Sequence, residues 1–351
     1  PLRAPERALS IREYPLFQKV SSWVRGNIFI PDPRVMWVSP SFRFLKNYIT
    51  ENDIQVVVTT GPPHSLHLIG LKLRKKLPSI KWIADFRDPW TNIDFYSKLM
   101  LTPGADRKHK RLEAQVLLKS DLVLSIGQHM SEEFKTIYLN HGGKTPDKFK
   151  VITNGYDEED VLVNEKRKDE AFSLAHIGTL VKDRNPEVLW RVLGKLVKEN
   201  AELKSKLQIK LVGKVDLFVK ERLAAHQLSA YVKYIEYLPH DEVIREQQRS
   251  KVLLLLVNNT PNARGILTGK FFEYMASGSP ILAIGPVDGE LAGILKETEC
   301  GFISGFEDET ELKKHLLQLF THPELIPNSE KIKRYSRKAL TEQLSAVLNA
   351  L

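Results

Sequence analysis

Short apolar runs alternate along the chain with amphipathic stretches, a pattern that predicts strands alternating with helices. In the first half, strands are predicted at 56–59, 82–84, 122–125 and 151–152, with helices at 64–76, at 108–119 and from 131 onward. In the second half, strands are predicted at 174–177, 209–212, 232–235, 252–257 and 281–284. Such alternation is typical of parallel sheets covered by helices on both faces. We therefore predict an α/β fold with two consecutive doubly wound halves.

A polar stretch separates these two halves. Residues 154–170 are rich in charged and poor in apolar side chains, as expected of a linker. We place the first domain at 1–155, the linker at 156–171 and the second domain at 172–328. The last part, 329–351, is predicted to be one helix, whose apolar face carries Leu340, Leu344, Val347 and Leu348.

The clearest functional pattern lies between Gly265 and Leu282. A helix is predicted to begin near Lys270 and to end at Gly278. Amide groups at a helix N-terminus attract anions, and Lys270 adds a positive charge. Glu273 lies on the same helix face and can accept two hydrogen bonds from a ribose diol. These features predict a cradle for a nucleotide diphosphate; the alternative is an ordinary amphipathic helix.

The segment Glu273-Tyr-Met-Ala-Ser-Gly-Ser-Pro280 resembles the donor-site helix of family four glycosyltransferases, a large bacterial group with the GT-B fold. The family signature has two Glu residues with seven residues between them. Glu273 matches the second, which faces the ribose, whereas Gly265 stands where the first would face the donor sugar.

The resemblance implies two Rossmann-like domains with a catalytic cleft between them and a C-terminal helix that crosses back to the first domain. The family begins with a strand and a glycine-rich loop, and neither is visible after Pro1. We therefore expect a further segment upstream of residue 1.

The resemblance also assigns the diphosphate-binding cations. Residues 178–186 resemble a family element, Gly-Arg-x-x-x-x-Lys-Gly, whose two cations neutralise the leaving diphosphate. Thr179 replaces its Arg, so Lys182 or Arg184 must supply the charge. We favour Arg184, because a guanidinium binds phosphate oxygens in a bidentate manner. The expected donor-binding residues are Gly178, Arg184, Leu238 (through its backbone, near the base), Leu267, Thr268, Gly269, Lys270 and Glu273.

Two carboxylates mark the first half. Asp85 and Asp88 follow a predicted strand, so they lie at the sheet edge where α/β proteins bind ligands. Beside Arg87 they can orient sugar hydroxyls, although an ion-paired turn is the alternative. His64 is expected in the same region, either there or as a structural hydrogen-bonding residue, with Ser65 as the N-cap of its helix. The expected catalytic residues are Asp85, Asp88, Arg184 and Lys270.

Charge is distributed unevenly along the chain. Residues 1–150 hold 24 Lys and Arg against 14 Asp and Glu, whereas residues 151–351 hold 28 against 29. A basic first half predicts an anionic partner, and we expect a weak contact of Lys72, Arg74, Lys75 and Lys76 with an anionic membrane. A merely soluble surface is the alternative. No nucleic-acid-binding motif is present, so nucleic acid is not expected as a partner.

Cysteine and hydropathy define the expected compartment. The single cysteine, Cys300, indicates a reducing environment, and no apolar run approaches the about 18 residues of a membrane span. No signal peptide is visible. We expect a cytoplasmic protein, peripheral at the inner face of the membrane. No metal-ligand spacing occurs, so neither a metal nor a cofactor is expected beyond a UDP- or GDP-linked sugar as substrate.

The sequence therefore predicts a metal-independent hexosyl- or related glycosyltransferase. It would move a sugar from a nucleotide-diphosphate donor to a glycan or lipid-linked acceptor during polysaccharide biosynthesis, and the family resemblance implies retention of configuration. One alternative is a catalytically silent GT-B protein that binds a glycan or partner in a synthesis complex, which Gly265 and Thr179 favour. Another is a GT-B nucleotide-sugar epimerase. The base, the donor sugar, the acceptor, the retaining or inverting outcome, the oligomeric state and the length of the upstream segment stay open.

Overall fold

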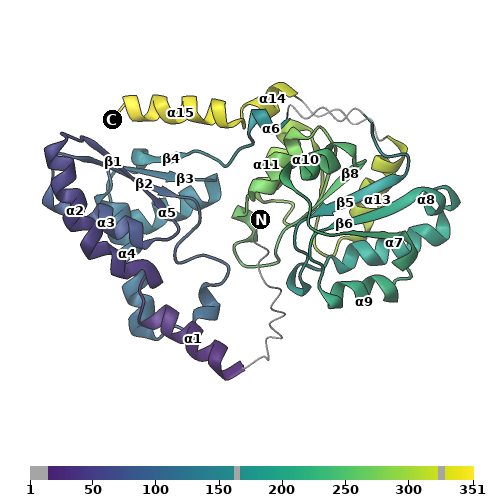
Figure 1. Ribbon diagram of the computed structural model, residues 1–351, viewed down its shortest axis with the longest axis horizontal. Helices are drawn as coiled ribbons and strands as arrows, with labels where there is room; N and C mark the ends of the chain where they lie inside the picture. Colours follow the sequence, from purple (N-terminus) through teal and green to yellow (C-terminus); the bar gives the residue numbers. More distant parts are fainter. Residues whose placement is uncertain (1–14, 162–166, 323–328) are drawn as a thin grey trace, which may run out of the picture. The chain divides into compact units, whose positions relative to one another are not determined.

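The computed structural model describes residues 15–161, 167–322 and 329–351 (Figure 1). The chain divides into two compact units, Pro1–Val123 with Thr136–Lys148, and Leu124–Lys135 with Phe149–Leu351. The domain limits predicted from the sequence stay predictions. Part of the predicted linker, 162–166, and the end of the predicted second domain, 323–328, lie outside the described residues.

The first sheet has four strands in the order β1-β2-β3-β4, and β1 pairs in parallel with β2. Its strands are β1 (Val56–Gly61), β2 (Lys81–Phe86), β3 (Leu122–Ser125) and β4 (Phe149–Val151). The helices are α1 (Pro15–Asn27), α2 (Val38–Glu51), α3 (Ser65–Lys76), α4 (Pro103–Lys119) and α5 (Gln128–Asn140), with short 3₁₀ turns η1 (Pro33–Trp37), η2 (Tyr96–Leu99) and η3 (Pro146–Lys148).

The second sheet has six strands in the order β10-β9-β8-β5-β6-β7, and every pairing in it is parallel. The strands are β5 (Phe172–Ile177), β6 (Leu207–Val212), β7 (Val232–Ile235), β8 (Val252–Leu256), β9 (Ile281–Ile284) and β10 (Gly301–Ser304). The helices are α6 (Glu158–Val161), α7 (Glu187–Glu199), α8 (Ala201–Lys206), α9 (Leu217–Ala225), α10 (His240–Arg249), α11 (Gly269–Ala276), α12 (Glu290–Thr298), α13 (Glu309–Thr321), α14 (Ser329–Lys333) and α15 (Arg337–Asn349).

Alternate residues of the second sheet enter two separate apolar cores, as the two-residue period of a strand requires. On β8, Leu254 and Leu256 pack with α7, α9 and α13, whereas Leu253 and Leu255 pack with α11 and α12. A sheet buried on both faces needs strands that are apolar throughout. The run Val252–Leu256 meets this need, which is why the sequence pattern located it.

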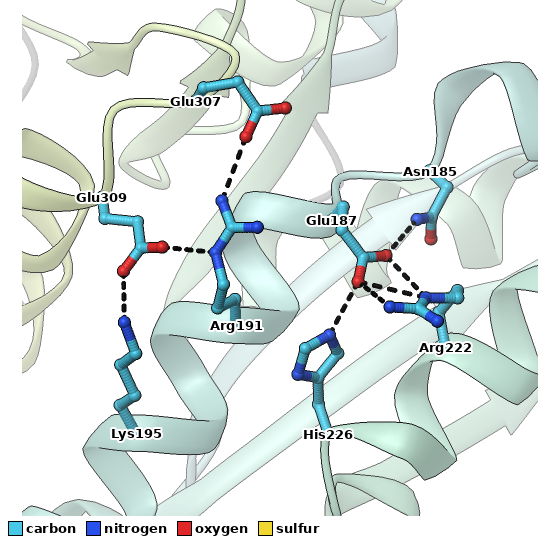
Figure 2. Close-up of polar contacts among 8 residues, drawn as sticks. All are labelled: Asn185, Glu187, Arg191, Lys195, Arg222, His226, Glu307 and Glu309. Carbon is cyan, nitrogen blue, oxygen red and sulfur yellow. Dashed lines mark hydrogen bonds and ion pairs between the residues drawn. The ribbon is translucent and has the colours of Figure 1, made fainter.

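Ion pairs join the helices on one face of this sheet (Figure 2). The Glu187 carboxylate accepts hydrogen bonds from Arg222 and His226, and these bonds, chiefly that of Arg222, lower the pKa of Glu187 to about 2. α7 is thereby joined to α9. Arg191 and Lys195 likewise pair with Glu309 and so join α7 to α13. Asn185 and Glu307 complete the group of eight residues.

The structure confirms every predicted strand, with small shifts at the ends, and adds β10, which was not predicted. The prediction of a single C-terminal helix is wrong, because this segment forms two helices, α14 and α15. The break occurs because Ser336 adopts an extended conformation, bridges to Tyr156 and accepts a hydrogen bond from the Ala339 amide as the N-cap of α15. The helix predicted from 131 begins earlier, at Gln128.

Candidate functional site

Two glycines and one lysine converge where β5 and β6 end. Gly178 follows β5 with φ +119°, and a Cβ atom there would lie 2.6 Å from Nζ of Lys270. Gly213 follows β6 with φ +106°, and a Cβ atom there would lie 3.2 Å from the carbonyl carbon of Gly178. Glycine allows both the positive φ and the close approach. The Lys270 ammonium group is therefore held directly against the backbone at the carboxyl edge of the sheet, the edge where ligands bind in α/β folds.

A second cation lies close to Lys270. Partial burial, followed by the charge of Arg184, lowers the pKa of Lys270 to about 8. Arg184 is positioned by a 2.8 Å hydrogen bond from its Nε to Oδ1 of Asn258. Within the described ranges, neither cation forms an ion pair with a carboxylate. Two partly desolvated cations that repel each other form a site that an anion stabilises.

Helix α11 adds its N-terminus to this cation pair. Thr268 is the N-cap residue, and its side chain accepts no capping hydrogen bond. A Cβ atom on Gly269 would meet nothing within 4 Å, so open space lies beside the first turn. Leu267 is buried in the apolar core, which leaves its backbone as the part available to a ligand. Free amides at a helix N-terminus are donors suited to phosphate oxygens.

Two buried polar side chains that the sequence analysis missed support this loop. The Tyr274 hydroxyl accepts a 3.0 Å hydrogen bond from the Ile177 amide and so fixes α11 to the end of β5. His176 lies 3.2 Å, through Nδ1, from the carbonyl oxygen of Leu254, so Nδ1 carries the hydrogen. Burial, with the charge of Lys270, lowers the pKa of His176 to about 3, and its ring is neutral. The signal that could have identified His176 from the sequence is a histidine inside the otherwise apolar predicted strand 174–177.

Glu273 lies on the exposed side of α11, three residues after Lys270, and lines a small pocket with Asp157 and His240. His240 comes two residues after Leu238, so the predicted base loop reaches the Glu273 pocket. Leu238 itself packs partly against the apolar core. Lys182, the alternative to Arg184, lies over the ring of Phe218 at 5.0 Å. The structure thus brings Gly178, Arg184 and Lys270 together. Glu273 lies on α11, the helix that carries Lys270.

The first-unit candidates lie at the carboxyl edge of β1 and β2. Asp85 is partly buried, which raises its pKa, while Arg87, 3.5 Å away, opposes the shift. Asp88 lines a pocket of about 530 Å³, and its pKa is raised by desolvation in the pocket wall and by the nearby Asp94. Asp88 therefore faces a cavity, whereas Asp85 pairs with its neighbour.

His64 and Trp90 form part of the wall of this pocket, with their rings stacked 5.1 Å apart. Burial lowers the pKa of His64 to about 4, so the ring is neutral. Trp90 Nε1 donates to Nδ1 of His109 at 3.1 Å, which places the His109 hydrogen on Nε2, facing the Gly26 carbonyl at 3.2 Å. The aromatic wall is therefore built from neutral, fixed rings.

The predicted N-cap at Ser65 is wrong. His64 occupies the N-cap position, and the carboxylate of Asp32 satisfies the start of α3. Oδ2 of Asp32 accepts from the Ser65 amide at 2.8 Å, and Oδ1 accepts from the Ser65 hydroxyl at 2.9 Å. A capping group 33 residues away in sequence cannot be identified from local spacing.

Several solved structures share the fold of this chain at low sequence identity. The match with sucrose-phosphate synthase from Thermosynechococcus elongatus covers 91% of this chain and 79% of the synthase chain, with TM-score 0.60 and 14% sequence identity. A UDP-forming α,α-trehalose-phosphate synthase from Burkholderia vietnamiensis matches 95% and 84%, with TM-score 0.64 and 10% identity. The lipopolysaccharide outer core galactosyltransferase WaaB matches 90% and 81%, with TM-score 0.60 and 13% identity. The fold is GT-B.

A match to a known protein family covers most of the second unit. Residues 157–339 match the family described as glycosyl transferases group 1, and the chain belongs to this family. A search of curated proteins finds no match. No helix in the described part of the chain is both long and apolar enough to span a membrane.

Proposed function

We propose that the protein transfers a hexose or related sugar from a nucleotide-diphosphate donor to a glycan or lipid-linked acceptor, with retention of configuration and without a metal ion. The observation that carries this proposal is the pair of cations, Lys270 and Arg184, held without a carboxylate partner in the described residues beside Gly178. Membership of the group 1 family supports it. The resemblance of the donor helix to family four supports retention.

In this proposal catalysis is electrostatic. As the bond between sugar and diphosphate breaks, negative charge develops on the leaving oxygen. Lys270, Arg184 and the first amides of α11 stabilise that charge, and because they are already in place, little reorganisation is needed. Glu273 accepts hydrogen bonds from the ribose hydroxyls. In the first unit, Asp88 orients an acceptor hydroxyl in the aromatic-walled pocket.

The experiment that tests the proposal is calorimetric titration with UDP and GDP, followed by a transfer assay with UDP-sugars, GDP-sugars and pooled acceptors. UDP is tried first, because one structural neighbour is UDP-forming. Saturable nucleotide binding with transfer supports the proposal, and NMR of the product reads its anomeric configuration. Absence of binding to either nucleotide would refute it.

A catalytically silent GT-B protein is the second candidate. Gly265 and Thr179 favour it, since both stand where the resemblance places charged residues. This candidate predicts nucleotide or glycan binding with no transfer and no hydrolysis. The transfer assay therefore separates the two candidates, provided that nucleotide binding has been measured on the same preparation.

Glu273→Ala is expected to weaken UDP binding by about 1–3 kcal/mol, because the ribose loses a charged hydrogen-bond partner. Glu273 is exposed, so the free energy of unfolding should stay close to that of the wild type. Glu299→Ala, an exposed glutamate after α12, is the control with the same charge change. Unchanged calorimetric affinity in Glu273→Ala would remove Glu273 from the site.

We also propose a peripheral contact of the first unit with anionic membranes, on the cytoplasmic side. Lys72, Arg74 and Lys75 line one side of a pocket of about 810 Å³ between the ends of α3 and α4. The apolar residues Ile69 and Leu73 of α3 are buried, so its charges make the contact. Each basic residue contributes at most about 1 kcal/mol, screened by salt. Binding to anionic vesicles should fall as salt rises; co-sedimentation equal with neutral vesicles would contradict the contact.

A further inference from the structure

The aromatic-walled pocket of the first unit has two cations at its edge. Arg25 and Arg34 both line it, and no carboxylate within the described ranges pairs with either guanidinium. The ring of Phe95 lies 5.6 Å from the Arg25 guanidinium, and that of Trp37 lies 5.9 Å from the Arg34 guanidinium. Such stacking orients a guanidinium and leaves its N–H groups free for an anion.

Neither carboxylate of this pocket, Asp32 or Asp88, forms an ion pair with Arg25 or Arg34 within the described ranges. Both carboxylate oxygens of Asp32 are already occupied by the start of α3, and Oδ1 also accepts from the Arg34 amide. Asp88 comes from the loop after β2, whereas the two arginines come from α1 and η1. The pocket therefore offers a carboxylate for a hydroxyl and two guanidinium groups for an anion.

Large apolar side chains are exposed on η1, which carries Arg34, and directly after α1, which carries Arg25. Ile28 is 59% exposed, Met36 72% and Trp37 58%. From Pro15 to Thr50 the chain holds five basic residues and one acidic residue, Asp32. Exposed Trp, Ile and Met side chains near basic residues in the sequence are suited to the boundary between lipid headgroups and acyl chains.

We infer that this pocket binds a phosphate-bearing acceptor attached to a lipid. The inference rests on the proposed glycosyl transfer and names its acceptor class. The phosphate or diphosphate binds Arg25 and Arg34, the lipid chain lies on Ile28, Met36 and Trp37, and the sugar enters the pocket toward Asp88. A free sugar phosphate would use the same arginines but would gain nothing from the apolar side chains.

The test measures binding of the whole protein to phosphatidylcholine vesicles that contain geranylgeranyl diphosphate, with UDP in excess so that the donor site is occupied. Co-sedimentation should exceed that with plain phosphatidylcholine vesicles. Inorganic diphosphate, which has the same anion without the chain, should compete only weakly. Competition by inorganic diphosphate at the affinity of the lipid would overturn the lipid assignment.

Variants with matched controls test the two arginines and the exposed apolar side chains separately. Arg34→Gln and Arg25→Gln should each weaken vesicle binding about tenfold, since each removes a charged hydrogen-bond donor. Arg43→Gln, an exposed arginine on α2 that does not line the pocket, is the matched control. Met36→Gln should weaken binding about threefold through lost apolar contact. Leu217→Gln, 68% exposed on α9, should not.

UDP affinity separates this inference from the proposed function. If the two arginine variants bind UDP as well as the wild type does, the donor site is intact. If they also bind the lipid diphosphate as well as the wild type does, the inference is wrong, although the donor site stands. If the wild type does not bind UDP, the proposed function fails, whatever the lipid result. If Arg34→Gln and Arg43→Gln weakened vesicle binding equally, the binding would be unspecific charge attraction, and the pocket assignment would be overturned.

Discussion

Replacing Lys270 by Gln should lower the transfer rate about 10²–10³-fold, the usual cost of removing one fixed charge that stabilises a leaving group. Nucleoside diphosphate affinity should fall as well, by about 1.5–3 kcal/mol for a charged hydrogen bond. The structural reason is that Lys270 lies against Gly178 at the sheet edge and has no ion-pair partner in the described residues. Steady-state kinetics and calorimetry measure the two effects.

The pH dependence gives a sharper reading of the same residue. Burial and Arg184 lower the pKa of Lys270 to about 8, so the free protein begins to lose this charge as the pH rises through 8. A bound diphosphate favours the charged form and raises the pKa of Lys270. Binding near pH 8 should therefore take up protons, and affinity should decline at higher pH. Titrations in buffers of different ionisation enthalpy detect the uptake.

Lys198→Gln is the matched control, because Lys198 is exposed at the end of α7. It should keep both the rate and the proton uptake of the wild type. Proton uptake at pH 8 that persists in Lys270→Gln would assign the titration to another group. An unchanged transfer rate in Lys270→Gln would remove the residue from the diphosphate site.

The sequence predicted five of the six strands of the second sheet because an apolar run is a local pattern, whereas the diphosphate site stays a prediction. The run Val252–Leu256 is apolar throughout, as a strand buried on both faces requires. Gly278 and Pro280 were predicted to end the helix, and α11 ends two residues before Gly278, at Ala276. The expectation that Arg184 rather than Lys182 binds the diphosphate came from the geometry of a guanidinium, and it stays a prediction. The structure places Arg184 close enough to Lys270 to lower the pKa of Lys270.

The features that were missed depend on contacts between residues distant in sequence. Asn258, which positions Arg184, lies 74 residues away, and Asp32 caps a helix 33 residues away. Gly213 matters because its backbone approaches Gly178, which no local pattern shows. The C-terminal break at Ser336 likewise depends on a bridge to Tyr156. Apolar periodicity continued across that break, so the sequence predicted one helix.

Gly178→Ala should cost stability and nucleotide affinity through two separable causes. The φ of +119° strains any residue with a Cβ atom, which should reduce the free energy of unfolding by about 1–3 kcal/mol. The new methyl group would also lie 2.6 Å from Nζ of Lys270. Because that nitrogen ends a flexible side chain, it can move aside, so the contact should displace the ammonium group rather than unfold the protein. UDP affinity should then fall by about tenfold or more.

A double-mutant cycle separates these causes. In a Lys270→Gln background, Gly178→Ala should still cost the backbone strain, measured by chemical denaturation, but should change UDP affinity little, since the displaced charge is already absent. Gly293→Ala is the control: Gly293 lies within α12, and a Cβ atom there meets nothing within 4 Å, so alanine should stabilise the protein by about 0.5–1 kcal/mol. Equal losses of UDP affinity from Gly178→Ala in both backgrounds would show that Gly178 acts on the nucleotide without Lys270, and the close approach of the two would not be what shapes the diphosphate site.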